Sequence, residues 1–198
     1  CAAAGLAGAE FMAGIPGTVG GALAMNAGAH GQETWSRVTR VRTLDRAGAV
    51  HVRAPADFEL GYRSVRLRSG TGPGAGPDKA EASPAQEWFL DAELHLTPDD
   101  PVAVRARMHT LLRHRAATQP LRQPNAGSVF RNPPGDHAGR LIEAAGCKGL
   151  RVGGAQVSEL HANFIVNTGD ARAADVEALI AQVRARVLAH AGVDLVPE

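Results

Sequence analysis

The chain of 198 residues is poor in cysteine and in net charge, and it has no long apolar run. Its two cysteines, Cys1 and Cys147, are too few for a disulfide framework and too far apart for a zinc motif. Lysine plus arginine number 21 and aspartate plus glutamate number 20, so the basic face of a nucleic-acid or membrane-surface protein is lacking. No apolar stretch is long enough for a transmembrane helix, and no signal peptide is recognisable. We therefore expect a cytoplasmic protein without nucleic-acid or membrane partners.

Several common catalytic patterns are also missing. The P-loop spacing does not occur, and no strand-like run of Val and Ile precedes Gly14, as a Rossmann fingerprint would require. The G-x-S-x-G elbow is absent around Ser128, which argues against a Ser-His-Asp hydrolase. Histidine and acidic residues do not occur at metal-ligand spacing, so we expect no metal site.

The chain does contain a glycine-rich segment between Gly14 and Gly31. Its glycines alternate with apolar residues, unlike the polar low-complexity sequence of a linker. Glycine permits positive φ and close approach of the backbone to a ligand. Successive N–H groups without side chains can surround a diphosphate. We interpret the segment as a diphosphate-binding loop, with a flexible loop as the alternative.

The remaining pattern predicts strands first and then mixed helices and strands, which favours an α+β fold with a boundary between residues 97 and 105. A hairpin is expected over residues 37–53, with its turn at 45–48, and a mobile Gly/Pro/Ala-rich loop over 70–86. Strict alternation predicts a strand over 88–96. The apolar residues expected on its one buried face are Trp88, Leu90, Ala92, Leu94 and Leu96.

Three helices and two further strands are expected after this boundary. Asp100 and Pro101 mark the start of a helix that ends before Pro120. Asp136 is expected to cap a short helix closed by Gly146. The other expected elements are a strand over 162–167, an amphipathic helix over 171–191 and a last strand over 192–198.

Three polar stretches lie next to glycine, at residues 61–64, 124–133 and 153–163. Each has a purely structural interpretation when taken alone. Arg63 could form a surface ion pair, Ser128 could be a turn hydroxyl and His161 could end a strand. Several such stretches in a fixed order are more specific than any one of them.

Together these motifs resemble the UDP-N-acetylenolpyruvoylglucosamine reductase (MurB) family. The matching sequences are GIPGTVGG with MNAG, then GYRS, then GSVFRNP, and then GGAQVS with HAN. The resemblance implies an α+β fold in two parts. Residues 1–100 would be part of a two-lobed, PCMH/VAO-like FAD-binding domain, and residues 101–198 a smaller α+β substrate-binding domain.

The resemblance implies reduction of UDP-N-acetylglucosamine enolpyruvate to UDP-N-acetylmuramate in peptidoglycan precursor synthesis. FAD would be the carrier and NADPH the hydride source, the partner would be a small UDP-sugar, and the protein would be a monomer. Arg63, Ser128 as proton donor and Glu198 would be catalytic. The implied substrate-binding residues are Tyr62, Asn132, Lys148 and His161. The implied cofactor-binding residues are Gly14, Ile15, Pro16, Gly17, Thr18, Gly20, Gly21, Asn26, Ala27 and Gly28.

Two other functions remain open: another FAD-linked oxidoreductase of the same flavin fold, and a non-catalytic truncated remnant. Family members carry a further glycine-rich flavin segment before the position of Gly14 and continue past that of Glu198. The resemblance thus implies a chain clipped at both ends. One subclass has a tyrosine-bearing insertion after its Tyr-Arg motif. The loop at 70–86 contains no tyrosine, which favours the other subclass.

Overall fold

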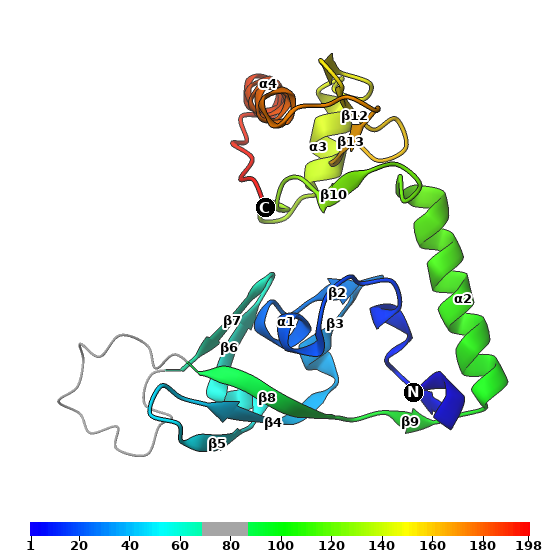
Figure 1. Cartoon of the computed structure of the whole chain (residues 1–198), viewed down its shortest axis with the longest axis vertical. Coiled ribbons are helices and arrows are strands. Elements are labelled where there is room, and N and C mark those ends of the chain that lie inside the picture. The colour runs from blue at the N-terminus through cyan, green and yellow to red at the C-terminus, as the bar shows by residue number, and fades with distance from the viewer. Residues whose placement is uncertain (69–86) are drawn as a thin grey trace. The chain divides into compact units, whose positions relative to one another are not determined.

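The computed structural model describes residues 1–68 and 87–198. The expected loop at 70–86 lies outside these residues. The chain divides into two compact units, Cys1–Leu112 and Arg113–Glu198, called unit 1 and unit 2 below. Helix α2 (Pro101–Thr118) crosses this division (Figure 1). It begins where Asp100 and Pro101 predicted, because the Asp100 carboxylate accepts the first free N–H groups of the helix.

Unit 1 consists mainly of short antiparallel strands, with a three-stranded sheet in the order β5–β4–β8 (Figure 1). Three further pairs are β1–β9, β2–β3 and β6–β7. The elements are β1 (Leu6–Ala7), α1 (Val19–Ala24), β2 (Gly28–Ala29), β3 (Gln32–Glu33), β4 (Val38–Leu44), β5 (Val50–Arg53), β6 (Phe58–Gly61), β7 (Ser64–Leu67), β8 (Trp88–Leu94) and β9 (Thr97–Pro98). Short 3-10 turns occupy Ala2–Ala4, Glu10–Met12, Thr34–Ser36 and Pro55–Asp57.

The β4–β5 hairpin confirms the predicted hairpin and its turn. The Asp45 carboxylate accepts the N–H groups of Ala47 and Ala49 at 2.8 and 2.9 Å. Gly48 has a φ of 82°, a conformation that other residues rarely adopt. The turn chemistry of this segment is therefore local, which is why the sequence alone identified it.

Strand β8 forms as predicted. The predicted buried face is confirmed for Ala92 and Leu94, which pack against the core of unit 1, but it is wrong for Trp88 and Leu90. Phe89 packs into the core of unit 1, whereas Trp88 and Leu90 are 45% and 50% exposed. Consecutive residues of β4 pair with Phe89 and Asp91, so Leu90 is an extra residue in β8. A bulge of this kind changes which face the neighbouring side chains occupy. Alternation in the sequence does not reveal such a bulge.

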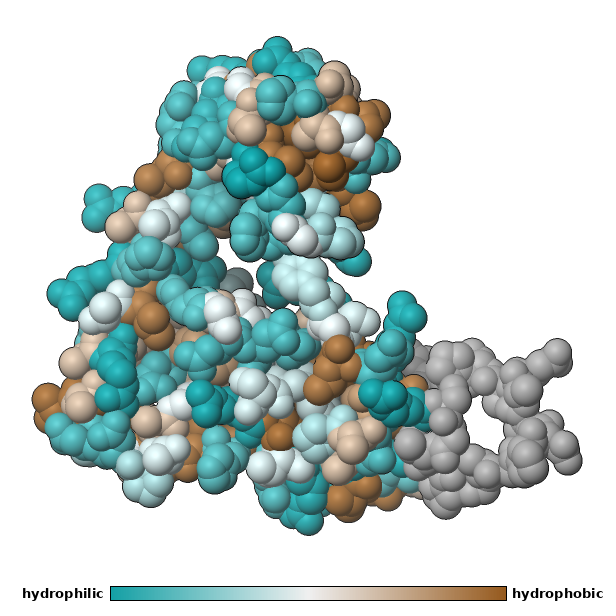
Figure 2. Space-filling view, turned by 180° about the vertical axis from the view of Figure 1, so that it is seen from behind, coloured by the Kyte–Doolittle hydropathy of each residue, from teal (hydrophilic) through white to brown (hydrophobic). Residues whose placement is uncertain are grey.

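The outer face of the β5–β4–β8 sheet is exposed and mixed in character. Cross-strand ion pairs join Arg40 to Glu93 and Arg42 to Asp91. Exposed apolar residues such as Val50 belong to the same sheet. Figure 2 shows apolar surface as separate brown patches among hydrophilic teal.

Unit 2 contains a four-stranded antiparallel sheet in the order β10–β13–β12–β11, with α3 and α4 packed together. The short helix predicted before Gly146 and the helix predicted over 171–191 are confirmed. The last strand predicted over 192–198 is wrong, because only an isolated bridge at Pro197 forms there. The elements are β10 (Asn125–Ser128), α3 (Ala138–Ala144), β11 (Arg151–Val152), β12 (Ala155–Val157), β13 (Phe164–Asn167) and α4 (Ala173–Ala191).

One apolar core holds unit 2 together. It joins the inner side of α4 to the inner positions of β12 and β13, and Leu195 near the end of the chain is also buried in it. Its buried members are Phe130, Ala138, Leu141, Ile142, Cys147, Ala155, Val157, Ala162, Ile165, Leu179, Val183, Val187 and Leu195. Within residues 1–68 and 87–198, no helix has both the length and the apolar character needed to cross a membrane.

Candidate functional site

The glycine-rich loop of unit 1 has a backbone that glycine alone adopts easily at two points. Gly14 and Gly17 have φ values of 82° and 130°. Thr18 then begins α1 as its N-cap, and its Oγ1 accepts the N–H of Gly21 at 3.1 Å. Ile15 is half-buried and Pro16 is exposed. The loop is therefore fixed at its end by a helix cap and exposed along most of its length.

Gly20 is different, because nothing in the described part of the protein requires glycine there. Its φ is not positive, and an added Cβ would approach no atom more closely than Thr18 Oγ1 at 3.9 Å. At Gly17 an added Cβ would meet nothing within 4 Å. The space beside this backbone is open, which a diphosphate in contact with main-chain N–H groups would require. The residues present thus fit the phosphate portion of FAD.

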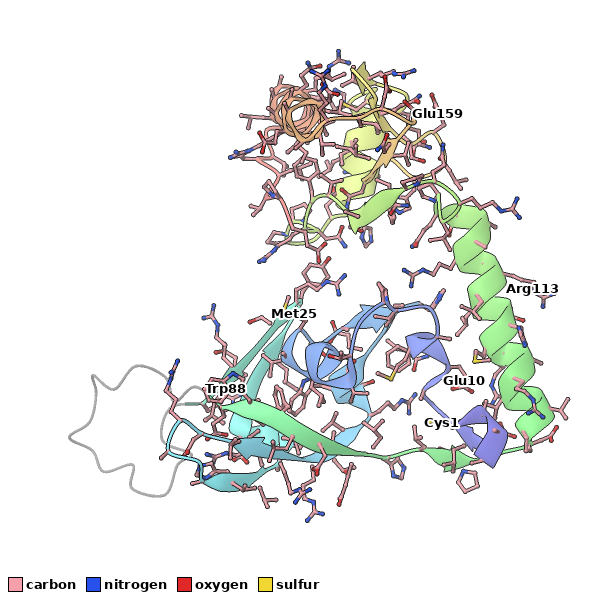
Figure 3. The ribbon with its side chains drawn as sticks, in the orientation of Figure 1. Cys1, Glu10, Met25, Trp88, Arg113 and Glu159 are labelled. Atoms are coloured by element: carbon pink, nitrogen blue, oxygen red, sulfur yellow. The ribbon has the colours of Figure 1, made fainter. Side chains whose placement is uncertain are left out.

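Asn26 lies in the predicted cofactor segment, but its side chain is buried and bonded within unit 1. Its amide donates to Glu33 Oε2 at 2.7 Å and to the Gly61 carbonyl at 3.3 Å. Its Oδ1 accepts the Trp35 N–H at 3.2 Å. Ala27 beside it is buried, while Met25, at the end of α1, stands out from the surface (Figure 3). The Asn26 side chain therefore connects the glycine-rich segment to the start of the Tyr-Arg motif.

Gly28 is required by contacts within the β2–β3 hairpin. An added Cβ would lie 2.6 Å from the Gln32 carbonyl oxygen, which is closer than real Cβ atoms approach. This glycine therefore has a structural role that does not depend on any ligand.

Tyr62 and Arg63 form the two-residue turn of the β6–β7 hairpin, between the paired residues Gly61 and Ser64. Arg63 has a φ of 55°, a left-handed conformation that is uncommon for a residue with a side chain. Its guanidinium carbon lies 5.8 Å from the centre of the Tyr62 ring, within cation–π range. Such strained residues concentrate at functional sites. The predicted catalytic arginine and substrate tyrosine are thus neighbours at a hairpin turn.

Ser128 ends β10 in unit 2, and its side chain is exposed. It pairs with Phe164 of β13, and the pairing changes register between Asn125 and Ser128. Gly127, with a φ of 88°, precedes it, and the Asn125 side-chain oxygen Oδ1 accepts the Gly127 N–H at 2.9 Å. The backbone therefore leaves the regular strand immediately before the serine, which presents the hydroxyl at the sheet end.

The last residues of the chain lie beside Ser128. Phe130 and Pro197 form an antiparallel bridge. The Glu198 N–H donates to the Val129 carbonyl at 2.9 Å. The structure therefore brings two of the three predicted catalytic residues, Ser128 and Glu198, into one hydrogen-bonded part of unit 2. Arg63 belongs to unit 1.

Asn132 and His161 both lie beside the first turn of α3. Asn132 Oδ1 accepts the Ala138 N–H at 3.0 Å, and an added Cβ on Gly139 would lie 3.3 Å from the His161 ring. The predicted cap was wrong, because the Asp136 carboxylate accepts the N–H of His137, outside the helix. The chain turns between residues 132 and 138, and this brings the Asn132 side chain to the first N–H of α3.

Lys148 and Glu143 form an ion pair whose two charges act on His161. Lys148 Nζ lies 2.8 Å from Glu143 Oε1. Burial lowers the pKa of His161, the positive charge of Lys148 lowers it further, and the carboxylate of Glu143 opposes this. His161 Nδ1 accepts the Asn163 N–H at 3.2 Å and its ring packs against Phe164. Its surroundings therefore favour the neutral ring, and its hydrogen bond and ring contact fix its orientation.

Two residues close to these positions were not predicted. Asn163 is 4% exposed, and its amide bonds to both backbone groups of Phe130. Glu33 accepts from Asn26 next to the Tyr-Arg turn. The His-Ala-Asn motif contained Asn163, but nothing in the sequence identified Phe130 as its partner, because the two lie far apart along the chain.

Unit 2 also has a surface depression of about 380 Å³. It is lined by the segment 119–123 that follows α2 and by the loop 158–160, whose Glu159 projects at the surface (Figure 3). Among the described residues, its lining includes none of those expected to contact substrate. It is therefore separate from the site built around Ser128.

Two family models match the chain. An FAD-binding domain model matches residues 1–53. A model of the UDP-N-acetylenolpyruvoylglucosamine reductase C-terminal domain matches residues 119–198. The matched ranges contain the open glycine-rich loop in unit 1 and the Ser128–Glu198 region in unit 2.

Individual relatives match over almost the whole chain. The UDP-N-acetylenolpyruvoylglucosamine reductase of Alkalilimnicola ehrlichii is 60% identical over 198 residues, which is 100% of this chain and 61% of the relative. That of Methylococcus capsulatus is 59% identical, over 96% of this chain and 58% of the relative. The crystal structure of UDP-N-acetylenolpyruvylglucosamine reductase (MurB) from Thermus caldophilus matches with a TM-score of 0.73 and 37% identity, over 99% of this chain and 64% of that one. The chain thus spans about 60% of the length of the curated relatives it matches.

These matches and the two units define an α+β fold of the FAD-binding, flavin-dependent class. Within that class, the C-terminal domain model that covers the Ser128 region narrows the assignment to one group of proteins. The chain belongs to the UDP-N-acetylenolpyruvoylglucosamine reductase family.

Proposed function

We propose that the protein is an FAD-dependent reductase that converts UDP-N-acetylglucosamine enolpyruvate to UDP-N-acetylmuramate with NADPH. The reaction would belong to peptidoglycan precursor synthesis in the cytoplasm, carried out by a monomer. The observation that carries the proposal is the pairing of the chain's last residues with the Ser128 segment, through the Glu198 N–H and the Val129 carbonyl. This pairing supports a site in unit 2 that contains a hydroxyl and a carboxylate.

FAD would be held by the open backbone of residues 14–21, with Thr18 fixing the end of the loop. A bound FAD would supply hydride transfer between NADPH and the enolpyruvyl double bond. The remaining chemistry falls to side chains of this chain.

Arg63 is proposed to stabilise negative charge. Hydride addition to one carbon of the double bond leaves an electron pair on the other carbon, shared with the adjacent carboxylate. A guanidinium presents a planar pair of donors to such a group. The turn that holds Arg63 in a left-handed conformation supports this role, because it restricts where the side chain can reach.

Ser128 is proposed to donate the proton that completes the reduction. Its hydroxyl would protonate the carbon that bears the electron pair, and the resulting alkoxide would regain a proton from solvent or a neighbouring acid. Glu198, on the adjacent backbone segment, is the proposed neighbouring acid. Tyr62, Asn132, Lys148 and His161 are proposed to bind the UDP-sugar.

The test is a measurement of cofactor content and turnover in the protein at its full natural length. We expect flavin absorbance, reduction of that absorbance by NADPH, and reoxidation by UDP-N-acetylglucosamine enolpyruvate with formation of UDP-N-acetylmuramate. A flavoprotein that NADPH reduces but this substrate does not reoxidise would be another FAD-linked oxidoreductase. A folded protein that binds no flavin would be a non-catalytic remnant.

A further inference from the structure

Asn163 makes a double hydrogen bond to the backbone of a single residue. The Phe130 N–H donates to Asn163 Oδ1 at 3.0 Å, and Asn163 Nδ2 donates to the Phe130 carbonyl at 2.8 Å. Both residues are buried, with Asn163 4% and Phe130 1% exposed. The amide therefore satisfies two buried backbone groups of a distant residue, which would be destabilising if they were left unpaired.

The pairing of the neighbouring backbone explains why the Phe130 groups are available to Asn163. Two hydrogen bonds form the bridge between Phe130 and Pro197. The Arg131 N–H donates to the Val196 carbonyl and the Glu198 N–H donates to the Val129 carbonyl, each at 2.9 Å. In an antiparallel pair of this type, the N–H and C=O of the residue between them point to the other side. The Phe130 groups therefore face away from the C-terminal segment, and Asn163 is the residue that meets them.

The same asparagine also holds Val129, the residue before Phe130, through its backbone carbonyl. The Val129 N–H donates to the Asn163 carbonyl at 2.9 Å, and Ser128 pairs with Phe164. Regular strand pairing is interrupted just before this point, between Asn125 and Ser128. The Asn163 side chain thus continues the connection to the sheet where the regular ladder has been lost.

We propose that Asn163 is a positioning residue that sets the relative positions of the Ser128 hydroxyl and the Glu198 carboxylate. This inference rests on the proposed function of Ser128 and Glu198. Asn163 holds Phe130 and Val129, Ser128 precedes Val129, and Glu198 bonds to the Val129 carbonyl. A side chain that supplies one donor and one acceptor over this short reach is characteristic of asparagine.

The first experiment compares half-reactions in the full-length protein for Asn163→Ala and Asn163→Asp. The aspartate side chain would keep the acceptor for the Phe130 N–H but lose the donor, so Asn163→Asp also serves if Asn163→Ala does not fold. We expect flavin reduction by NADPH at the parent rate and reoxidation by the enolpyruvyl substrate slowed by about tenfold to 10²-fold, the cost of a small misplacement. Equal slowing of both half-reactions, or no slowing, would overturn the proposal.

A double variant distinguishes positioning from general weakening of the fold. If Asn163 acts through Ser128, Ser128→Ala with Asn163→Ala should be no slower than Ser128→Ala alone. Additive slowing would contradict this. The matched control is Asn167→Ala, at the end of β13, whose Oδ1 accepts the N–H groups of Gly169 and Ala171 away from Ser128. It should leave both half-reactions unchanged.

A structural measurement keeps this inference separable from the proposed function. In Asn163→Ala, amide hydrogen exchange should accelerate at residues 129–131 and at Glu198, while α4 stays protected as in the parent. If the parent protein does not turn over the enolpyruvyl substrate, the proposed function fails, and exchange alone decides whether Asn163 fixes these backbones. Unchanged exchange at Glu198 would overturn the positioning role.

Discussion

Unit 1 and unit 2 carry their candidate sites in different ways. In unit 1 the proposed cofactor site is largely main chain, with glycines at 17 and 20 whose added Cβ atoms would meet nothing nearer than 3.9 Å. One polar side chain of that segment, Asn26, is buried and bonded within the unit. In unit 2 the proposed groups are side chains, Ser128 and Glu198, carried by backbone segments that hydrogen bonds fix to each other. Such an arrangement suits a flat cofactor held by backbone and a substrate that receives a proton from a side chain.

The two units also differ in the kinds of contact that form their cores. Among the described residues, the core cluster of unit 2 has 13 buried members and that of unit 1 has five. Unit 1 exposes apolar residues beside its glycine-rich loop, among them Val19 at 65% and Met25 at 42%. It also contains an ion pair whose two side chains are almost fully buried, Arg53 with Glu87. Unit 1 therefore depends more on buried polar contacts, and unit 2 on apolar packing.

The largest effect is expected for Ser128→Ala, which separates the chemistry of unit 2 from that of unit 1. Loss of one positioned general acid should slow reoxidation by the enolpyruvyl substrate by about 10²- to 10⁴-fold. Reduction of the flavin by NADPH is the internal control and should not change. Stopped-flow absorbance follows both steps. Reoxidation within a few-fold of the parent would remove Ser128 from the chemistry.

The next effect concerns the stability of unit 1. Arg53 Nη2 lies 2.5 Å from Glu87 Oε1, and Thr43 Oγ1 donates to Glu87 Oε2 at 2.5 Å. Burial alone would raise the pKa of Glu87, but the bonds from Arg53 and Thr43 outweigh it and lower this pKa. Arg53→Ala would leave Glu87 as a buried charge and should reduce the free energy of unfolding by about 3–5 kcal/mol.

Denaturant unfolding measures this loss, and Asp91→Ala is the matched control on the same sheet. Asp91 pairs with Arg42 on the exposed face, where ion pairs contribute little. Its removal should leave the unfolding midpoint close to that of the parent. Similar small shifts for both variants would show that unit 1 does not depend on the buried pair.

The sequence predicted the elements whose signals are local. The β4–β5 turn, the start of α2 at Pro101 and the end of α4 at Gly192, with a φ of 68°, all depend on residues next to each other in the chain. The amphipathic face of α4 was also predicted, because its apolar positions recur with the helical period and three of them are fully buried.

Features that depend on distant partners were not predicted. The bulge at Leu90 exists because β8 pairs with β4, and it placed Phe89 instead of Trp88 in the core. Asn132, rather than Asp136, bonds to the first N–H of α3. In each case the deciding contact is made in three dimensions, so local pattern carries no signal for it.

The candidate site also combines features that the sequence indicated with features that depend on distant contacts. The motifs identified its residues only through their resemblance to a family, and the roles of Arg63, Ser128 and Glu198 stay predictions. The β-bridge that brings the end of the chain to Phe130, and the Asn163 amide behind it, join segments that the sequence separates widely. Residue type alone could not show which of several asparagines makes these bonds.

A third prediction tests whether the open glycine-rich loop of unit 1 binds FAD. Gly20→Val introduces a side chain where the protein leaves space, so the variant should fold normally but bind FAD poorly. The flavin-to-protein ratio and the unfolding midpoint measure the two effects. The contrast is Gly28→Ala, whose Cβ would meet the Gln32 carbonyl at 2.6 Å and should lower the midpoint itself. Stoichiometric FAD in folded Gly20→Val would exclude this loop as the diphosphate site.

The smallest expected effect is the pH dependence of stability that His161 gives to unit 2. Burial first, and then the charge of Lys148, lowers its pKa below the ordinary value of 6.5. Between these two pKa values the unfolded chain binds more protons than the folded one, so stability rises with pH there. The contribution of His161 is fully present above pH 6.5 and is lost as pH falls toward the folded pKa, with a slope below about 1.4 kcal/mol per pH unit.

His161→Asn should remove this part of the slope, because an amide side chain does not titrate in this range. Its Oδ1 can still accept the Asn163 N–H that His161 Nδ1 now accepts, so the local structure should be kept. Lys148→Ala should weaken the slope, because it removes a positive charge that disfavours protonation of the ring. The matched control is Lys148→Arg, which keeps a positive charge at this position and should therefore leave the slope unchanged. Unfolding free energies measured across pH 5 to 8 for the three variants separate these outcomes. A slope that His161→Asn leaves intact would assign the proton uptake of unit 2 to another group, and the charge of Lys148 would then have no His161 titration to act on.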